Sequence, residues 1–255
     1  MSGSQFPRRR VLGSAAALAG GVLLGSTAPA LARNPKAAAA PRIYTRAEWG
    51  ALPPQTVATI LDHGPDHLVV HHTASANTTD YSQNAAFALS RSIQDLHMNT
   101  NGWGDTGQQL TISRGGFVME GRNRTLESFS EKLLVMGAQT ANNNSHTLGI
   151  ENEGTYISET PTTALWNSLV ASLAYLCTLY GLDPQTAIVG HRDYVATQCP
   201  GDAFYAQLPQ LRNDVAGQLG TAKRAVSRPT RIFTNLPKPH FRFDHGPAVG
   251  RGELR

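Results

Sequence analysis

The chain has 255 residues, of which 40% are hydrophobic and 16% charged, and this is enough for one globular domain with a sizeable core. The formal net charge is +4, but residues 1–32 carry three arginines and no acid, and residues 221–255 carry eight basic and two acidic residues. Subtracting these contributions of +3 and +6 leaves −5 for residues 33–220. The charge of the folded part therefore argues against a nucleic-acid-binding domain, and we expect no nucleic-acid partner.

Residues 1–32 have the features of an export signal. Arginines at positions 8–10 form a twin-arginine pattern, a weakly apolar run follows over residues 11–24, and residues 30–32 form a small-x-small cleavage site. The apolar run is too short for a permanent anchor, although a retained anchor is the alternative. We therefore predict a twin-arginine signal peptide, a secreted or cell-wall location, and a linker over residues 33–41.

The first predicted core element is a strand that ends in two histidines. Residues 68–70 are apolar β-formers that run directly into His71 and His72. Because successive side chains of a strand point to opposite faces, only one of these histidines can point into a shared site. Upstream, residues 43–49 predict an edge strand or an N-terminal arm.

The middle of the chain predicts one helix and several strands. Thr79 or Asp80 can cap a helix that runs to about Met98. His97, near its end, is expected to complement the helix dipole rather than to bind a metal. Further strands are predicted over residues 108–114, 117–120, 133–138 and 147–154.

The C-terminal part predicts two more helices. One starts at residue 162 or 163 and runs to about residue 180, where Gly181 ends it, and the other covers residues 204–219. A short buried strand is predicted over residues 187–189. Strands interleaved with helices predict an α/β fold, a single domain over residues 42–220 with a central mixed β-sheet flanked by helices.

Residues 221–255 predict a basic, disordered tail. They are rich in proline and arginine and show no clear periodicity. Their positive charge suggests an electrostatic contact with anionic wall polymers.

A three-ligand metal site is predicted at one end of the sheet. His191 follows the strand at residues 187–189, and Cys199 lies eight residues further on. Imidazole and thiolate are ligands that zinc prefers, and three protein ligands with an open fourth position are typical of catalytic zinc. His71 or His72 can supply the third ligand. The alternative is that each histidine merely ends a strand.

The two cysteines leave two possibilities open. In an exported protein a pair of cysteines normally indicates a disulfide, and a bond between Cys177 and Cys199 would remove the sulfur from the metal site. Cys177 falls in the middle of the helix predicted over residues 162–180, near its apolar stripe. We therefore favour a zinc thiolate at Cys199 and a buried free thiol at Cys177.

Glu151 is the candidate for proton transfer. It lies in an otherwise apolar predicted strand, where an ionisable residue is unusual unless it is paired or functional. A carboxylate beside a nucleophilic water can accept its proton and pass it to a leaving amine. Simple surface exposure is the alternative.

Several motifs, in a fixed order over roughly residues 42–210, resemble the zinc N-acetylmuramoyl-L-alanine amidases of the peptidoglycan recognition protein and phage lysozyme type (amidase type 2). The motifs are Arg46-Ala47-Glu48-Trp49-Gly50, Val70-His71-His72-Thr73-Ala74, Met119-Glu120-Gly121-Arg122, Gly190-His191-Arg192-Asp193 and Cys199-Pro200-Gly201-Asp202. The resemblance implies that His71, His191 and Cys199 bind Zn²⁺, with the first histidine of the pair coordinating.

The resemblance also implies roles for other residues. Some branches of the family carry a catalytic Glu in a strand like that of Glu151, and Thr197 stands where a second helper donates to the developing oxyanion. Gln108 stands where many members have a catalytic Tyr, and an amide can hydrogen-bond but cannot act as an acid or base. Gln108 and Trp103 are candidates for contacting substrate, although packing is an equal alternative for Trp103.

The sequence therefore predicts an exported, monomeric zinc amidase that cuts the N-acetylmuramoyl–L-alanine amide bond of peptidoglycan. The alternative is a non-catalytic protein that binds or recognises peptidoglycan. Cys199 favours the enzyme, and Gln108 favours the alternative. A third possibility is that zinc serves only as a structural staple.

Overall fold

The computed structural model describes residues 38–220, 248 and 249. The predicted signal peptide at 1–32, the first part of the predicted linker at 33–41, and all but two residues of the predicted tail at 221–255 lie outside the described residues. In the described ranges no helix combines the length and the apolarity needed to cross a membrane.

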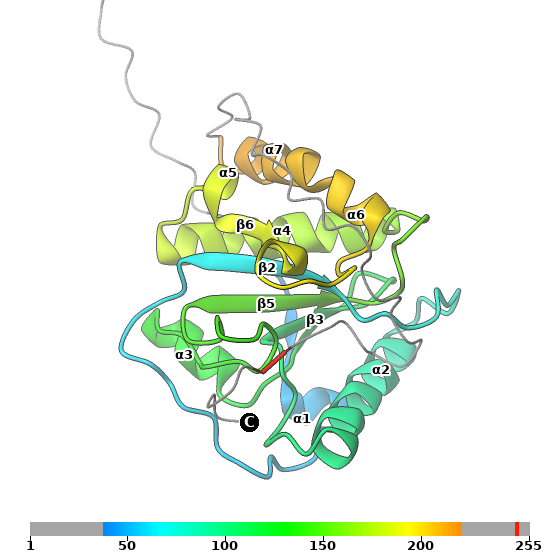
Figure 1. Cartoon of the computed structure of the whole chain (residues 1–255), viewed down its shortest axis with the longest axis vertical. Helices are drawn as coiled ribbons and strands as arrows, with labels where there is room; N and C mark the ends of the chain where they lie inside the picture. Colours follow the sequence, from blue (N-terminus) through cyan, green and yellow to red (C-terminus); the bar gives the residue numbers. More distant parts are fainter. Residues whose placement is uncertain (1–37, 221–247, 250–255) are drawn as a thin grey trace, which may run out of the picture. The chain divides into compact units, whose positions relative to one another are not determined.

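A six-stranded sheet forms the centre of the domain (Figure 1), in the order β1-β4-β3-β5-β2-β6. Strands β3 and β4 are antiparallel, and every other neighbouring pair is parallel, so the sheet is mixed as predicted. The strands are β1 (Ile43–Tyr44), β2 (His67–His72), β3 (Leu110–Ile112), β4 (Val118–Glu120), β5 (Thr147–Asn152) and β6 (Ile188–Gly190).

Helices flank the sheet, and the longest of them is capped as the sequence predicts. In α4 (Thr163–Tyr180) the side chain of Thr162 accepts a hydrogen bond from Leu165 N, and Gly181 ends the helix with a φ of 69°. The other helices are α1 (Arg46–Trp49), α2 (Gln83–Asp95), the π-helical turn η1 (Leu96–Thr100), α3 (Thr125–Glu131), α5 (Pro184–Ala187), the 3₁₀ turn η2 (His191–Asp193), α6 (Asp202–Ala206) and α7 (Leu208–Gln218).

The start of α2 differs from the sequence prediction. Ser82, and not Thr79 or Asp80, caps this helix by accepting a hydrogen bond from Ala85 N. The Asp80 carboxylate instead accepts from Ser82 N, which forms a turn before the helix.

Three other segments also differ. Residues 133–138 form no strand and make a single bridge, between Ile60 and Val135. The helix predicted over residues 204–219 is divided at Gln207 into α6 and α7. Helix α3 was not predicted, because its seven residues are too few to display a helical period.

The two faces of the sheet have different compositions. On the core face, Leu68 and Val70 of β2 join Leu148 and Ile150 of β5 in one cluster with the apolar residues of α4 and α7. Figure 1 shows these two helices close to β6. The alternate residues point to the opposite face, which we call the site face, and there β2 presents Val69 and His71.

One part of the predicted tail packs on the domain. Ala248 is buried, and its carbonyl accepts a hydrogen bond from Asn144 Nδ2 at 2.9 Å.

Candidate metal centre

Three side chains converge on the site face at the carboxyl end of the parallel strands. The ligand atoms of His71, His191 and Cys199 all lie within 4.8 Å of one another, and all three residues are buried. The distance from His71 Nδ1 to Cys199 Sγ is 3.6 Å. A nitrogen and a sulfur bound to one tetrahedral zinc lie about 3.6 Å apart, so the donor set fits this ion in both chemistry and spacing.

The sheet register explains how the two histidines meet. Strands β2 and β6 run parallel with Val70 beside Gly190, so the residues that follow, His71 in β2 and His191 just after β6, lie at the same end of the sheet. Their imidazole centroids are 4.4 Å apart.

The loop that carries Cys199 is held by hydrogen bonds to its neighbours. Arg192 N donates to Cys199 O at 3.1 Å, and Cys199 N donates to the Thr197 hydroxyl at 3.1 Å. The backbone N–H of His72 donates to the Cys199 sulfur at 3.4 Å. Three separate contacts therefore fix the position of the sulfur.

Only one histidine of the pair on β2 points into this centre. His71 faces Cys199, whereas His72 lies on the core face, where its Nδ1 accepts from Tyr156 N at 3.3 Å. The alternation of side chains along the strand is confirmed, and the histidine implied by the family resemblance is the one that joins the metal-binding group.

The two cysteines are not bonded to each other. Cys177 and Cys199 are both free thiols, so the disulfide alternative is wrong. Burial raises the pKa of the Cys199 thiol well above its usual range; the His72 N–H opposes this rise, and the nearby Glu151 adds to it. A metal that binds here must therefore displace a proton from the sulfur.

Gln139 orients the imidazole of His71. Its Oε1 is 2.7 Å from His71 Nε2, and its Nε2 donates to the Thr147 hydroxyl at 2.8 Å. That hydroxyl donates its own proton to Asn143 O, so the Gln139 amide is held with its oxygen towards His71. His71 therefore carries its proton on Nε2 and presents the Nδ1 lone pair to the metal site.

Gly149 leaves the space that the Gln139 side chain occupies. A Cβ on Gly149 would lie 2.7 Å from the Cγ and Cδ of Gln139, so only glycine fits beneath it. Asn144 Oδ1 accepts from Gln139 N at 2.7 Å and fixes the loop above the strand. Gln139 is not predicted from the sequence, because no spacing pattern joins it to a residue 68 positions away.

Glu151 lies beside the ligands. It is the register partner of His71 across β5 and β2, so its side chain points to the site face, and it is fully buried. Its charge also acts on the Cys199 thiol. The structure thus places a carboxylate next to the candidate metal centre, as a proton-transfer role requires.

The remaining predicted site residues have contacts of their own. Thr197 is buried, and its hydroxyl accepts from Cys199 N, as described above. Gln108 is buried and donates to the Thr111 hydroxyl at 2.8 Å, and Thr111 is the β3 register partner of Glu151. The Gln108 Oε1 has no hydrogen-bond partner among the described residues.

Trp103 packs on His97, with ring centroids 4.5 Å apart. His97 lies in the π-helical turn η1, and its Nδ1 accepts from Gly107 N at 3.1 Å. The histidine lies in the last turn of the helix, where a role with the helix dipole was predicted, and it also holds the loop of residues 101–107.

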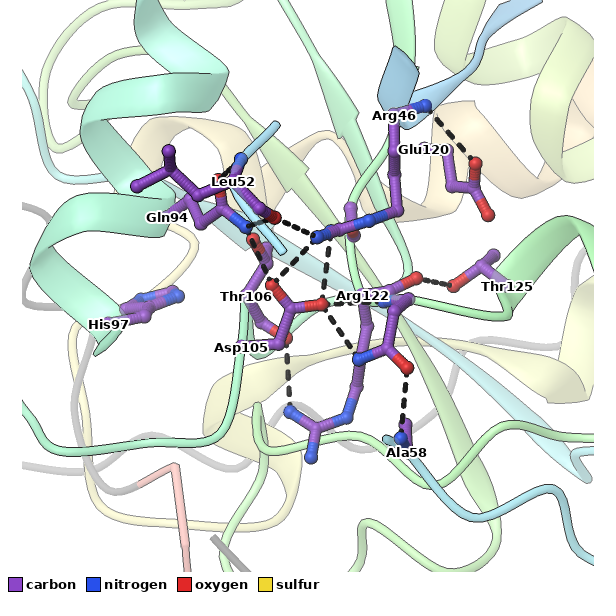
Figure 2. A network of polar contacts seen from close by, with 12 residues as sticks. Arg46, Leu52, Ala58, Gln94, His97, Asp105, Thr106, Glu120, Arg122 and Thr125 are labelled. Atoms are coloured by element: carbon purple, nitrogen blue, oxygen red, sulfur yellow. Dashed lines mark hydrogen bonds and ion pairs between the residues drawn. The ribbon is translucent and has the colours of Figure 1, made fainter. Parts of the chain in front are cut away.

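A buried polar network, which the sequence analysis did not find, holds the same loop (Figure 2). Asp105 is fully buried and accepts hydrogen bonds from Arg46, Gln94 and Asn123. Arg122 donates to Thr106 O at 3.0 Å. The network joins the N-terminal arm, α2 and the end of β4 to the loop, so the loop position is fixed from three sides.

Comparisons with known proteins agree with this geometry. The family described as N-acetylmuramoyl-L-alanine amidase matches residues 61–202. A human protein named N-acetylmuramoyl-L-alanine amidase is 33% identical over 194 residues, which are 75% of this chain and 32% of the human protein. This chain therefore spans about a third of that relative's length. Peptidoglycan-recognition protein SC2 of Drosophila melanogaster is 30% identical, over 67% of this chain and 86% of the relative.

Solved structures share the fold. Drosophila PGRP-LB superposes with a TM-score of 0.57 at 25% identity and covers 66% of this chain and 92% of its own. The endolysin LysCS from Clostridium intestinale superposes with a TM-score of 0.51 at 22% identity, over 72% of this chain and 98% of its own, which is a likeness of fold alone.

Proposed function

The chain belongs to the N-acetylmuramoyl-L-alanine amidase family, and on this premise we propose that it is a zinc-dependent amidase acting on peptidoglycan. The bond cut is the amide between the lactyl group of N-acetylmuramic acid and the L-alanine of the stem peptide. The observation that carries the proposal is the convergence of His71, His191 and Cys199 beside the buried carboxylate of Glu151.

The chain's own residues divide the work. His71, His191 and Cys199 would hold a zinc ion, which would acidify a water and polarise the carbonyl. Glu151 takes the proton of the attacking water and delivers it to the departing nitrogen. Thr197 donates its hydroxyl proton to the charge that develops on the carbonyl oxygen. Gln139 keeps His71 in the tautomer that binds the metal.

Peptidoglycan fragments are the proposed ligand class. The support is that the similar protein PGRP-LB of Drosophila has been solved, as a point mutant, in complex with tracheal cytotoxin. Gln108 and Trp103 are the proposed substrate contacts. For Gln108 the support is that its Oε1 has no hydrogen-bond partner among the described residues and can accept a hydrogen bond from a substrate amide.

The site of action is proposed to lie outside the cytoplasm. The support is the twin-arginine pattern within residues 1–32. Replacing Arg9 and Arg10 with lysine should retain the protein inside the cell, and export of the double variant at the normal rate would contradict this part of the proposal.

A muropeptide digest tests the activity. Zinc-loaded protein should release a free stem peptide with L-alanine at its amino end, and a chelator should stop the release. Glu151→Gln should bind zinc normally and release no peptide. Glu153→Gln is the matched control, because that carboxylate is already engaged with Arg114 N and the Thr78 hydroxyl.

The same digest separates the alternatives. Binding of muropeptide without release by the zinc-loaded protein would identify the non-catalytic recognition protein. Undiminished release by Glu151→Gln would show that this carboxylate is not the proton carrier, which is the result expected if zinc is only a structural staple.

A further inference from the structure

A second cluster of metal-binding side chains lies at the other end of β2. Asp66 directly precedes the strand, His67 is its first residue, and His146 directly precedes β5. Strands β2 and β5 are parallel, with His67 beside Thr147, so the three side chains meet at the amino ends of the two strands. A backbone hydrogen bond of 3.0 Å from Asp66 N to His146 O joins them. We propose that Asp66, His67 and His146 form a second site, for a divalent transition-metal cation.

The spacing of the donor atoms fits such a cation. Asp66 Oδ1 is 2.8 Å from His67 Nδ1 and 2.9 Å from His146 Nδ1, and the three ligand atoms all lie within 4.8 Å of one another. Oxygen and nitrogen ligands at zinc distances that subtend a right angle are about 2.9 Å apart. The cluster is therefore suited to a five- or six-coordinate ion whose other positions are filled by water.

The hydrogen bonds of His146 provide an independent reason. Asn143 Nδ2 donates to Ala141 O at 2.7 Å, which leaves Asn143 Oδ1 to accept from His146 Nε2 at 3.2 Å. A neutral His146 that donates from Nε2 has only a lone pair on Nδ1, and this lone pair faces the Asp66 carboxylate. A metal cation between these two atoms, which are 2.9 Å apart, would bind both the lone pair and the carboxylate oxygen.

The cluster is open to solvent. The Asp66 side chain is 60% exposed, and those of His67 and His146 are 28% and 37% exposed. Water can therefore complete the coordination, and the metal can enter directly from solvent.

The chemistry of the donors distinguishes this site from the buried one. It offers two imidazoles and a carboxylate but no thiolate, a set that suits Zn²⁺, Ni²⁺ or Cu²⁺. Because its ligands are exposed and less preorganised, we expect it to bind more weakly than the site that contains Cys199.

A metal bound at this site would also affect the loop that carries Cys199. The ring of Tyr194 lies edge-on to His67 and His146, with centroids 6.1 and 5.9 Å away. Tyr194 is in the loop between His191 and Cys199. A metal at the second site therefore stabilises a contact on which this loop rests, and it should raise the thermal stability of the protein even when the buried centre is disabled.

Metal counting on the full chain tests the proposal. After dialysis against a micromolar excess of free Zn²⁺, the wild type should retain two ions per chain, and the double variant His67→Gln/His146→Gln should retain one. Cys199→Ala should also lose one ion. His63→Gln is the matched control, since this exposed histidine lies three residues before Asp66 in the sequence and outside the cluster, and it should retain two.

Two further measurements assign the ions to sites. Co²⁺ in the buried centre should give the intense near-ultraviolet band of a thiolate ligand, which the double variant keeps and Cys199→Ala loses. Ni²⁺ should raise the melting temperature of Cys199→Ala but not that of Cys199→Ala combined with the two histidine changes. Retention of one ion by the wild type, or of two by the double variant, would overturn the proposal.

Discussion

The two faces of the sheet divide the molecule into a part that holds the fold together and a part that carries the chemistry. On the core face of β2, Leu68 and Val70 belong to one hydrophobic cluster with residues of α4 and α7. On the site face of the same strand, His71 joins Cys199 and His191, and His67 joins the exposed cluster at the other end. A one-residue alternation therefore separates stability from function within six residues.

This division implies that the two faces respond differently to substitution. The core face excludes water, so shortening a side chain there removes contacts and leaves a cavity. The site face is held by hydrogen bonds between polar groups, so a change there should alter metal binding before it alters folding. The following variants test whether the separation holds.

The largest expected effect is that of Cys199→Ala on the site face. Losing a metal ligand should weaken zinc binding by more than the roughly 10- to 100-fold that an outer hydrogen-bond partner contributes, and release of stem peptide should fall below detection. Cys177→Ala, in α4 on the core face, is the matched control, because both changes remove one buried sulfur. In zinc-free protein each should lower the free energy of unfolding by about 1 kcal/mol.

Competition with a chromogenic chelator measures the zinc affinity, and urea unfolding in chelator measures the stability. Equal zinc affinity of the two alanine variants would show that Cys199 is not a ligand.

On the core face, Leu169→Ala should have the opposite effects. Leu169 of α4 is fully buried in the main cluster, so the truncation should lower the free energy of unfolding by about 2–5 kcal/mol. The zinc affinity of the protein that remains folded should be unchanged. Urea unfolding and a zinc titration well below the melting temperature check the two statements, and a tenfold loss of affinity would break the separation between the faces.

The elements that the sequence predicts well are those with strong local signals. Helix α4 has a cap at Thr162, an apolar stripe and Gly181, and all three are read from neighbouring residues. The strands that contain His71 and Glu151, and the strand that directly precedes His191, are apolar runs followed by polar residues, and parallel strands bring such ends together.

The features that the sequence does not predict depend on contacts between distant residues. Gln139 lies just after a segment that was expected to be a strand, and its role follows only from the contact with His71. Asp105 is buried among groups from three other segments. Asp66, His67 and His146 have no recognisable ligand spacing, because the parallel pairing of β2 and β5 brings them together.

A smaller effect is expected from Gln139→Leu, which tests how the site face is preorganised. Without the acceptor at Oε1, His71 loses the hydrogen bond that sets its tautomer and ring orientation, and zinc affinity should fall about 10- to 100-fold. Gln109→Leu is the matched control, because Gln109 is equally buried and its side chain bonds to Val135 O and Gly149 N, neither of which belongs to a proposed ligand.

Chelator competition and unfolding in zinc-free buffer should separate the two glutamine variants. Both should lose stability, and only Gln139→Leu should lose zinc affinity. A Gln139→Glu variant, which keeps an acceptor for His71 Nε2, should recover most of the affinity. Equal affinity losses at positions 109 and 139 would assign Gln139 a purely structural role.

The smallest and most graded effect is that of pH on two buried thiols. Burial raises the pKa of both, to about 12 for Cys177 on the core face and well above the usual range for Cys199. In zinc-free protein the folded state keeps these protons while the unfolded state loses them, so stability should be full below about pH 8.5 and should decline as pH rises above it.

The zinc affinity should instead rise with pH, because the metal displaces the proton of Cys199. Between about pH 7 and 8.5, above the imidazole range, zinc affinity should rise about tenfold per pH unit. Calorimetry in buffers of different ionisation enthalpy, on protein that also carries His67→Gln/His146→Gln, should report that the sulfur at position 199 releases one proton per zinc ion. Cys177→Ala should leave this proton release unchanged, and Cys199→Ala should abolish it. An affinity independent of pH in the wild type would mean that the sulfur on the site face carries no proton for the metal to displace.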